Sequence, residues 1–160
     1  MVTDMGNPIL GTNLVTQIGI LVNDIERTAQ DYADFFGVAK PPISCTGVYD
    51  EALTQYMGKP TLARTKQAFF DIGPHIQIEL LEPDQGPSTW RHDLDENGEG
   101  VHHIAFDIDG MEEKIQLCAG KGMPLLQRGQ WATGSYAYID GNEKLKLVLE
   151  LLEHKPPQKG

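Results

Sequence analysis

Cysteine is scarce in this sequence, with only Cys45 and Cys118 among 160 residues. Two widely separated cysteines are too few for a disulfide framework or for a metal site built from thiolates. No run of about 18 apolar residues is present, so we expect no transmembrane helix. Residues 1–13 lack the basic and apolar segments of a secretory signal. Together these absences predict a reducing, cytoplasmic location and no membrane partner.

Positive charge is also in short supply, with 13 Lys and Arg against 23 Asp and Glu and a formal net charge of −10 at pH 7. Such a charge repels phosphate backbones, and no basic stripe offsets it, so a nucleic-acid partner is not expected. The segment 58–66 is a local exception because it contains Lys59, Arg64 and Lys66. We interpret it either as a solvated basic loop or as a docking point for an anionic substrate.

The pattern of apolar runs divides the chain into two similar halves, each with a strand, a helix and three further strands. In the first half, an apolar run at 14–22 is followed by a helical pattern that closes at Gly37. Residues 50–66 are polar and are interpreted as a loop that could include a short helix. The other predicted strands lie at 39–50 (irregular), 67–73, 76–82, 101–108, 124–132, 135–140 and 146–153, and a second helix follows Asp109 and ends at Gly122.

Short strings recur in the two halves in the same order, which is the signature of a duplication. The string QIGILVNDIE resembles HIAFDIDGME, AFFDIG resembles YAYIDG, and IELLE resembles LELLE. The sequence therefore predicts an α+β fold of two tandem βαβββ modules. The expected boundaries are an N-terminal tail (1–13), a first module (14–83), a linker (84–100), a second module (101–153) and a C-terminal tail (154–160).

Each half carries one conspicuous polar residue in its first strand and one in its last, namely Gln17 and Glu79, then His103 and Glu150. A buried carboxylate must be neutralised by protonation, by a basic side chain or by a metal. Lys146 is the one cation that strand parity places on the Glu150 face. A divalent ion held by two carboxylates, an imidazole and an amide oxygen would neutralise both carboxylates. That donor set suits Zn, Mn, Co, Ni or Fe(II).

Small neighbours support a shared cavity face. Gln17 lies on the same face of its strand as Gly19, and His103 lies on the same face as Ala105. Small residues such as these leave space above a sheet. Taken singly, each polar residue has an ordinary structural explanation, such as a solvent-facing edge position for Glu150. Their symmetric positions in a repeat favour the common site.

These features resemble the vicinal oxygen chelate superfamily over residues 14–153. That superfamily includes glyoxalase I, methylmalonyl-CoA epimerase, extradiol dioxygenases and bleomycin-resistance binding proteins. The resemblance implies a cup-shaped mixed sheet formed by the two modules around a metal. The strings IELLEP and LDENGEGVHHIAFDID are similar to the corresponding stretches of methylmalonyl-CoA epimerases.

The resemblance also implies the ligand set of one divalent ion, Zn, Co, Ni or Mn. Gln17 takes the first ligand position, where those epimerases have His, and Glu79 takes the second. The second His of the HHIAF string, His103 rather than His102, takes the third, and Glu150 takes the fourth. The set Gln-Glu-His-Glu is similar to that of zinc-type glyoxalase I.

The implied activity is removal of a proton alpha to a carbonyl through a metal-bound enolate, as in an epimerase. Glu150 is the first candidate for the base, and Glu79 is the candidate for the opposite face. A glyoxalase I-type lactoylglutathione lyase is the alternative enzyme. Ring-opening dioxygenase chemistry is disfavoured because it needs two histidines and one carboxylate, and His103 alone is suitably placed.

The substrate is expected to be a small molecule, either an acyl-CoA or a glutathione adduct, and the protein is expected to be a homodimer. CoA phosphates would require cations, for which the candidates are Lys59, Arg64, Lys66 and Arg128.

A glutathione carboxylate would require a clamp, for which Arg64, Arg91 and Asn13 are candidates. The remaining alternative is a metal-free binding protein of the resistance type. Its aromatic cavity would be built from Trp90, Trp131, Tyr136 and Tyr138.

Overall fold

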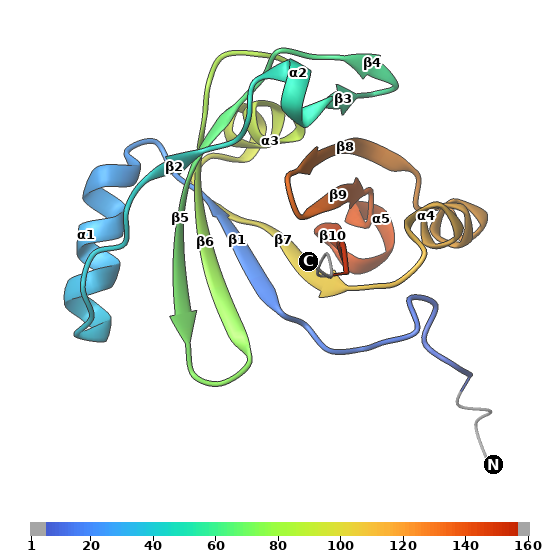
Figure 1. Ribbon diagram of the computed structural model, residues 1–160, viewed down its shortest axis with the longest axis horizontal. Coiled ribbons are helices and arrows are strands. Elements are labelled where there is room, and N and C mark those ends of the chain that lie inside the picture. Colours follow the sequence, from blue (N-terminus) through green and yellow to red (C-terminus); the bar gives the residue numbers. More distant parts are fainter. Residues whose placement is uncertain (1–5, 157–160) are drawn as a thin grey trace.

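The fold is a single curled sheet of ten strands with one helix of each half on its outer side (Figure 1), in a computed structural model that describes residues 6–156. The outermost parts of the predicted tails, residues 1–5 and 157–160, lie outside the described residues. Helix α1 lies outside the strands of the first half, and α4 lies outside those of the second (Figure 1). The predicted α+β class and curved mixed sheet are confirmed.

Both modules have the same order of elements along the chain. The first consists of β1 (Gln17–Leu21), α1 (Ile25–Phe36), β2 (Ser44–Cys45), β5 (Thr65–Ile72) and β6 (Ile76–Pro83). The second consists of β7 (Gly100–Asp107), α4 (Met111–Gly120), β8 (Leu125–Trp131), β9 (Gly134–Ile139) and β10 (Val148–His154).

The two modules are joined through their first strands. The strand order is β2-β5-β6-β1 in the first module and β7-β10-β9-β8 in the second, and β1 pairs antiparallel with β7. In each module the first strand runs parallel to the last, β1 to β6 and β7 to β10. The predicted duplication is therefore a duplication of topology, and the two last strands flank the central pair.

The helices form where the sequence predicts them. Asp24 accepts a hydrogen bond from the Arg27 amide at the start of α1, and Gly37 ends that helix in the left-handed conformation. Ile25, Ala29 and Ala33 of α1 are buried against the first module's strands. Among residues 6–156, no helix combines the length and the apolar character that a bilayer crossing requires.

The predicted linker contains a packed helix, α3 (Thr89–Asn97), which begins after Ser88 and ends at Gly98. Its Trp90 and Leu94 are buried in the hydrophobic cluster that also contains Tyr138. The connection between the modules is thus part of the core. A short helix, α5 (Asn142–Leu145), precedes β10.

Residues 50–66 include the short helix that the sequence analysis allowed, but the two strands that follow it were predicted as loop. The segment contains α2 (Tyr49–Ala52), followed by β3 (Gln55–Tyr56) and β4 (Lys59–Pro60), which extend the sheet. Strand β3 pairs with β8 of the other module (Figure 1). Two-residue strands are too short to produce a periodic pattern, so sequence periodicity did not detect them.

Candidate metal centre

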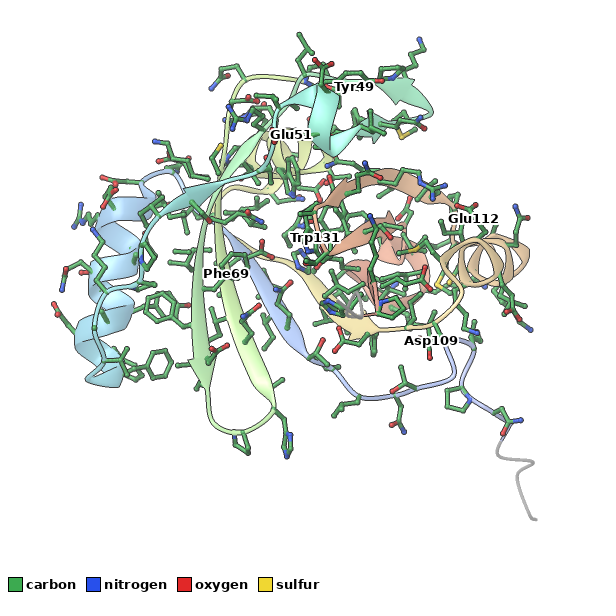
Figure 2. The ribbon with its side chains drawn as sticks, in the orientation of Figure 1. Tyr49, Glu51, Phe69, Asp109, Glu112 and Trp131 are labelled. Atoms are coloured by element: carbon green, nitrogen blue, oxygen red, sulfur yellow. The ribbon has the colours of Figure 1, made fainter. Side chains whose placement is uncertain are left out.

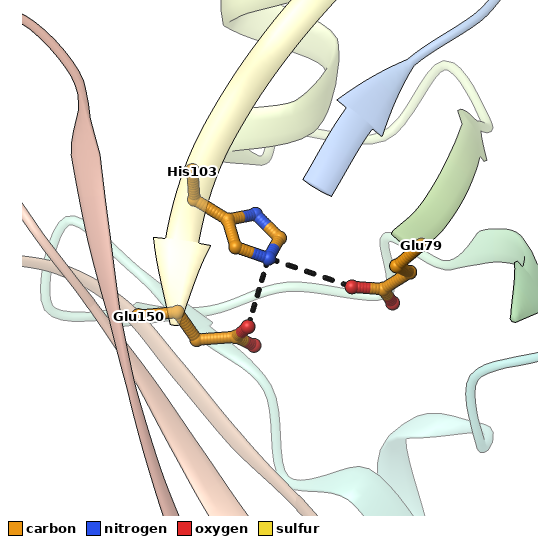
Figure 3. A group of neighbouring side chains, drawn as sticks. All are labelled: Glu79, His103 and Glu150. Carbon is orange, nitrogen blue, oxygen red and sulfur yellow. Dashed lines mark ion pairs between the residues drawn. The ribbon is translucent and has the colours of Figure 1, made fainter. Parts of the chain in front are cut away.

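The four polar residues singled out in the strands meet at one point between the modules. The His103 Nε2 atom lies 2.8 Å from Glu150 Oε2, 3.5 Å from Glu79 Oε2 and 3.0 Å from Gln17 Oε1. Figure 3 shows the two carboxylates converging on the same nitrogen of the imidazole, each from a different strand. All four side chains are buried. The structure therefore brings together the complete set of predicted metal ligands.

Strand register explains this convergence. In the central antiparallel pair, Gln17 lies opposite Ala105 and Gly19 lies opposite His103. A Cβ atom on Gly19 would lie 2.1 Å from His103 Cε1, so any side chain there would displace the imidazole ring. Each neutral ligand thus extends over a small residue of the facing strand, as the alternation in the sequence predicts.

Burial and charge act in opposite directions on His103. Burial disfavours its charged form, but the Glu150 and Glu79 carboxylates outweigh burial and raise the pKa of His103 to about 10. Burial also raises the pKa of Glu150. The two carboxylates therefore favour positive charge at this point. A metal ion bound at the same place would take over that positive charge.

The orientation of the Gln17 amide tests whether a metal fits. Its oxygen lies 3.0 Å from Glu79 Oε2 and 2.9 Å from Glu150 Oε2, so it faces only other acceptors and the imidazole. Turning the amide round would place N–H groups there, but the oxygen would then face Gln77 Oε1 at 2.8 Å. A cation among the four donors makes the oxygen-inward orientation favourable.

The donor chemistry also fits a divalent ion. Glu79, His103 and Glu150 each offer one atom within 4.8 Å of the others, which makes them a group that could hold a metal ion. Bonds of about 2.0–2.2 Å to nitrogen and oxygen suit donors that lie roughly 3 Å apart. Gln17 Oε1 would complete a set of four, and this mixed nitrogen and oxygen set suits borderline metals.

His102 contacts the centre from an unexpected side. Between Gly19 and Ile20 the register with β7 shifts, so that His102 is the extra residue of a bulge. Its Nδ1 lies 2.9 Å from His103 Nδ1, and its Nε2 lies 3.2 Å from Asp93 Oδ2 on α3. Burial lowers the pKa of His102, which favours its neutral form. Simple alternation would have placed its ring on the other face, and no feature of the sequence reveals the bulge.

Two further glutamines, Gln67 and Gln77, contact the proposed ligands, and sequence reasoning identified neither of them. Gln67 Nε2 donates to Glu79 Oε1 at 2.8 Å. Gln17 Nε2 donates to Gln77 Oε1 at 2.8 Å. Gln67 lies on β5 and Gln77 on β6. Gln77 shares the face of Glu79 in an alternating strand, whereas no comparable signal marks Gln67.

A cavity of about 470 Å³ opens beside the centre, between the modules. Both carboxylates and Gln17 form part of its wall. Figure 2 shows Phe69 on the strand pair of the first module and Trp131 on the second. The aromatic residues that line the cavity are Phe69, Trp90, Trp131, Tyr136 and Tyr138. Of these, Trp90, Tyr136 and Tyr138 also belong to a buried hydrophobic cluster, so they line the cavity and pack in the core at the same time.

The four basic residues proposed to bind substrate are not among the residues that line this cavity. Lys66 pairs with Glu82 at 2.8 Å, and Arg64 Nε donates to the Thr46 carbonyl at 2.8 Å. Arg128 pairs with Glu112, which lies on α4 at the outside of the second module (Figure 2). Lys59 is exposed on the edge strand β4.

The other side chains considered as charge partners or as a carboxylate clamp are engaged elsewhere or exposed. The placement of Lys146 on the Glu150 face was wrong, because β10 begins only at Val148 and parity does not extend before it. Lys146 Nζ instead donates to the Glu143 carbonyl at 2.7 Å. Arg91 pairs with Asp95 on α3 at 2.6 Å, and Asn13 is exposed.

Comparison with known proteins agrees with this architecture. The model of a family described as the Glyoxalase/Bleomycin resistance protein/Dioxygenase superfamily matches residues 16–139. The chain is also 28% identical over 151 residues to the uncharacterized protein YqjC of Bacillus subtilis, covering 91% of this chain and 96% of that protein.

Several solved structures share the fold. The methylmalonyl-CoA epimerase of Mycobacterium tuberculosis has a TM-score of 0.64 at 18% identity, covering 95% of this chain and 93% of the other. The hypothetical protein BH1468 of Bacillus halodurans has a TM-score of 0.63 at 24% identity, covering 91% and 97%. A variant of the Streptomyces coelicolor methylmalonyl-CoA epimerase in complex with 2-nitronate-propionyl-CoA has a TM-score of 0.60 at 19% identity, covering 89% and 98%.

Proposed function

The chain belongs to the glyoxalase/bleomycin resistance/dioxygenase superfamily, and from that premise we propose that it is a metal-dependent enzyme of the methylmalonyl-CoA epimerase type. The reaction is removal and return of a proton alpha to a substrate carbonyl. One observation carries the proposal, which is the meeting of Gln17, Glu79, His103 and Glu150 at the wall of an aromatic cavity.

In this proposal those four residues hold one divalent ion, Zn, Co, Ni or Mn. When bound, the ion polarises the substrate carbonyl and makes the adjacent C–H bond more acidic. Glu150 accepts the proton at a carboxylate oxygen, because it borders the cavity beside the proposed ion. Glu79 approaches the centre from the other module and serves the opposite face of the substrate.

The size of the cavity limits what enters it. A volume of about 470 Å³ suits a small acyl group, so a CoA ester would leave its nucleotide outside. Lys59, Arg64, Lys66 and Arg128 remain the proposed partners of its phosphates. Methylmalonyl-CoA epimerases that share the fold have been solved in complex with methylmalonyl-CoA and with 2-nitronate-propionyl-CoA, which supports this substrate class.

The test combines metal analysis with proton exchange. The purified protein should contain about one divalent ion per chain, and deuterium should enter the alpha position of methylmalonyl-CoA in D₂O. Glu150→Gln should abolish exchange while metal is retained, whereas Glu143→Gln on exposed α5 should leave exchange unchanged. Normal exchange by metal-loaded Glu150→Gln would overturn the base assignment.

A glyoxalase I-type lyase is the second candidate. The amide at the first ligand position favours it, because that position carries His in the epimerases that the sequence resembles. The hemithioacetal of methylglyoxal and glutathione is the discriminating substrate. Turnover of this adduct without exchange on acyl-CoA esters would replace the epimerase proposal.

A metal-free binding protein is the third candidate, favoured by the aromatic walls of the cavity. Such a protein would bind aromatic ligands equally well after chelation and after Glu79→Gln. An enzyme of the proposed type would lose activity under both treatments.

We also propose that the protein is a cytoplasmic homodimer. Cys45 and Cys118 are free thiols in the structure, as a reducing compartment would keep them. Light scattering after size-exclusion chromatography would test the dimer, and fractionation of the source cell would test the location.

A further inference from the structure

Two short rows of polar side chains lead outward from the neutral ligands of the metal centre. One row begins at Gln17 and ends at Asp71, and the other begins at His103 and ends at Asp93. Both rows end in a carboxylate, and neither terminal carboxylate lies among the four proposed ligands.

The first row crosses three neighbouring strands in register. Asp71 of β5 lies opposite Gln77 of β6, and Gln77 lies beside Gln17 of β1. Gln77 Nε2 donates to Asp71 Oδ1 at 3.1 Å, and Gln17 Nε2 donates to Gln77 Oε1 at 2.8 Å. Asp71 is exposed and lines an open groove next to the cavity.

The polarity of this row is set at its outer end. An ionised carboxylate only accepts hydrogen bonds, so Asp71 requires the NH₂ group of Gln77. The Gln77 oxygen must then face Gln17, which turns the Gln17 NH₂ group outward. The Gln17 oxygen is left facing the centre, as a metal ligand requires.

The second row fixes a nitrogen in the same way. Asp93 Oδ2 lies 3.2 Å from His102 Nε2, which is an ion-pair distance, although the two atoms lack hydrogen-bond geometry and this buried nitrogen has no hydrogen-bond partner. The charge of Asp93 favours the tautomer of His102 that carries its hydrogen on Nε2, because a carboxylate only accepts. In neutral His102 the Nδ1 atom is then an acceptor, and it lies 2.9 Å from His103 Nδ1. A hydrogen on His103 Nδ1 satisfies that contact and leaves the Nε2 lone pair facing the centre.

We propose that Asp71 and Asp93 are positioning residues that set the orientation of the Gln17 amide and the tautomer of His103 for metal binding. This inference rests on the metal site of the proposed function but not on its reaction. Outer partners of metal ligands commonly change metal affinity by about 10–100-fold, so the effect is measurable by titration.

The sharpest test exchanges the chemistry of Asp71 and Gln77 at constant charge. Asp71→Asn removes the fixed acceptor, and Gln77→Glu places two carboxylates side by side, so each single variant should lose Co²⁺ affinity. The double variant Asp71→Asn with Gln77→Glu restores the order of donors and acceptors, because Glu at 77 accepts from Gln17 and Asn at 71 donates to it. It also has the net charge of the wild type.

We expect Co²⁺ titrations, followed by visible absorption, to show losses of about tenfold for the single variants and recovery in the double variant. Asp71→Lys should reverse the row and change the absorption bands of any bound Co²⁺, because a lysine only donates. Asp107→Lys makes the same charge change in the same groove outside the row and should have a smaller effect.

The second row can be tested with a matched pair of variants. Asp93→Asn should weaken Co²⁺ binding, whereas Asp95→Asn, two residues along the same helix, should not. Thermal unfolding of each metal-free variant controls for loss of fold, and exposed Asp71 should tolerate substitution.

Equal Co²⁺ affinities and spectra in the wild type, Asp71→Asn, Asp71→Lys and Asp93→Asn would overturn the positioning roles. Those results would leave the proposed reaction intact if proton exchange persisted. Conversely, the wild type could bind Co²⁺ and the variants could bind it more weakly, while the wild type exchanges no substrate proton. That result would support the positioning roles and contradict the epimerase proposal. A wild type that does not bind Co²⁺ would overturn both.

Discussion

The two modules share a topology but support their ligands differently. In register, Gln17 of the first module corresponds to His103 of the second, and Glu79 corresponds to Glu150. The carboxylate is the same in both, whereas the neutral ligand is an amide in one and an imidazole in the other. Its neighbour on the parallel strand is Gln77 in the first module and Val148 in the second.

This difference shows how each neutral ligand determines its own support. An amide has two polar ends that can exchange places, so Gln17 needs a polar partner on the adjacent strand. An imidazole has its second nitrogen on the far side of the ring, and a bulge brings His102 to that side. The duplicated backbone therefore serves two ligand types without a change in strand order.

Residues next to the ligands also differ between modules, and the largest predicted effect comes from that difference. Gly19→Ala should displace the His103 ring and reduce metal affinity by more than about 100-fold, because a Cβ atom there would lie 2.1 Å from His103 Cε1. The reverse change at the equivalent position of the other module, Ala105→Gly, should cost only about 0.5–1 kcal/mol of stability. Metal titration and thermal unfolding measure the two effects.

A double variant separates a clash from a general folding defect. In a His103→Ala background the ring is absent, so Gly19→Ala should lower the thermal midpoint less than it does in the wild type, although metal binding should not recover. Similar metal affinities for Gly19→Ala and Ala105→Gly would contradict the asymmetry between the modules.

Converting the first module's ligand to that of the second should have an intermediate effect. Gln17→His should raise Zn²⁺ affinity by about tenfold, because imidazole is a better zinc ligand than an amide and Gln77 Oε1 can accept its second N–H. Competition with a chromophoric chelator measures the change. A loss of affinity would mean that the site requires the shape of the amide.

The packing of α3 on the second module should contribute less. Trp90 Nε1 donates to the Tyr138 hydroxyl at 2.9 Å, within a cluster that no residue of α1 shares. Trp90→Phe keeps most of the ring and should lower the free energy of unfolding by about 1 kcal/mol through the lost hydrogen bond. Chemical denaturation measures it, with Trp131→Phe as the partly exposed control.

The smallest effect is expected where α2 of the first module contacts β8 of the second module. Gln130 Nε2 donates to the Glu51 carbonyl at 3.1 Å in an exposed setting. Gln130→Ala should cost about 0.5 kcal/mol of stability and leave metal affinity unchanged. A large loss of cooperativity in unfolding would show that this contact holds the modules together more strongly than its exposure indicates.

Much of the fold was predictable because the two halves repeat apolar strands of ordinary length. The four proposed ligands could be singled out because each is polar within such a strand. The partners of those ligands were not, since Asp71 and Gln77 meet Gln17 only through the pairing of strands that are distant in sequence. Pairing register between distant strands cannot be deduced from alternation alone.

Two further errors have local physical causes. Parity reasoning extended to Lys146, but the chain is in a left-handed turn there and the strand has not begun. Parity also failed at His102, because a bulge inserts one residue and redirects the side chain. Alternation is informative only within an uninterrupted strand.

Both ends of the ten-stranded sheet finish in strands of two residues, β2 at one end and β4 at the other. Strand β4 consists of Lys59 and Pro60, a charged residue and one that has no amide hydrogen to offer. Strand β4 itself therefore offers a neighbouring molecule little backbone for extending the sheet. At the other end, β2 pairs with only two residues of the eight-residue β5, so sheet extension is blocked by sequence at the β4 end alone.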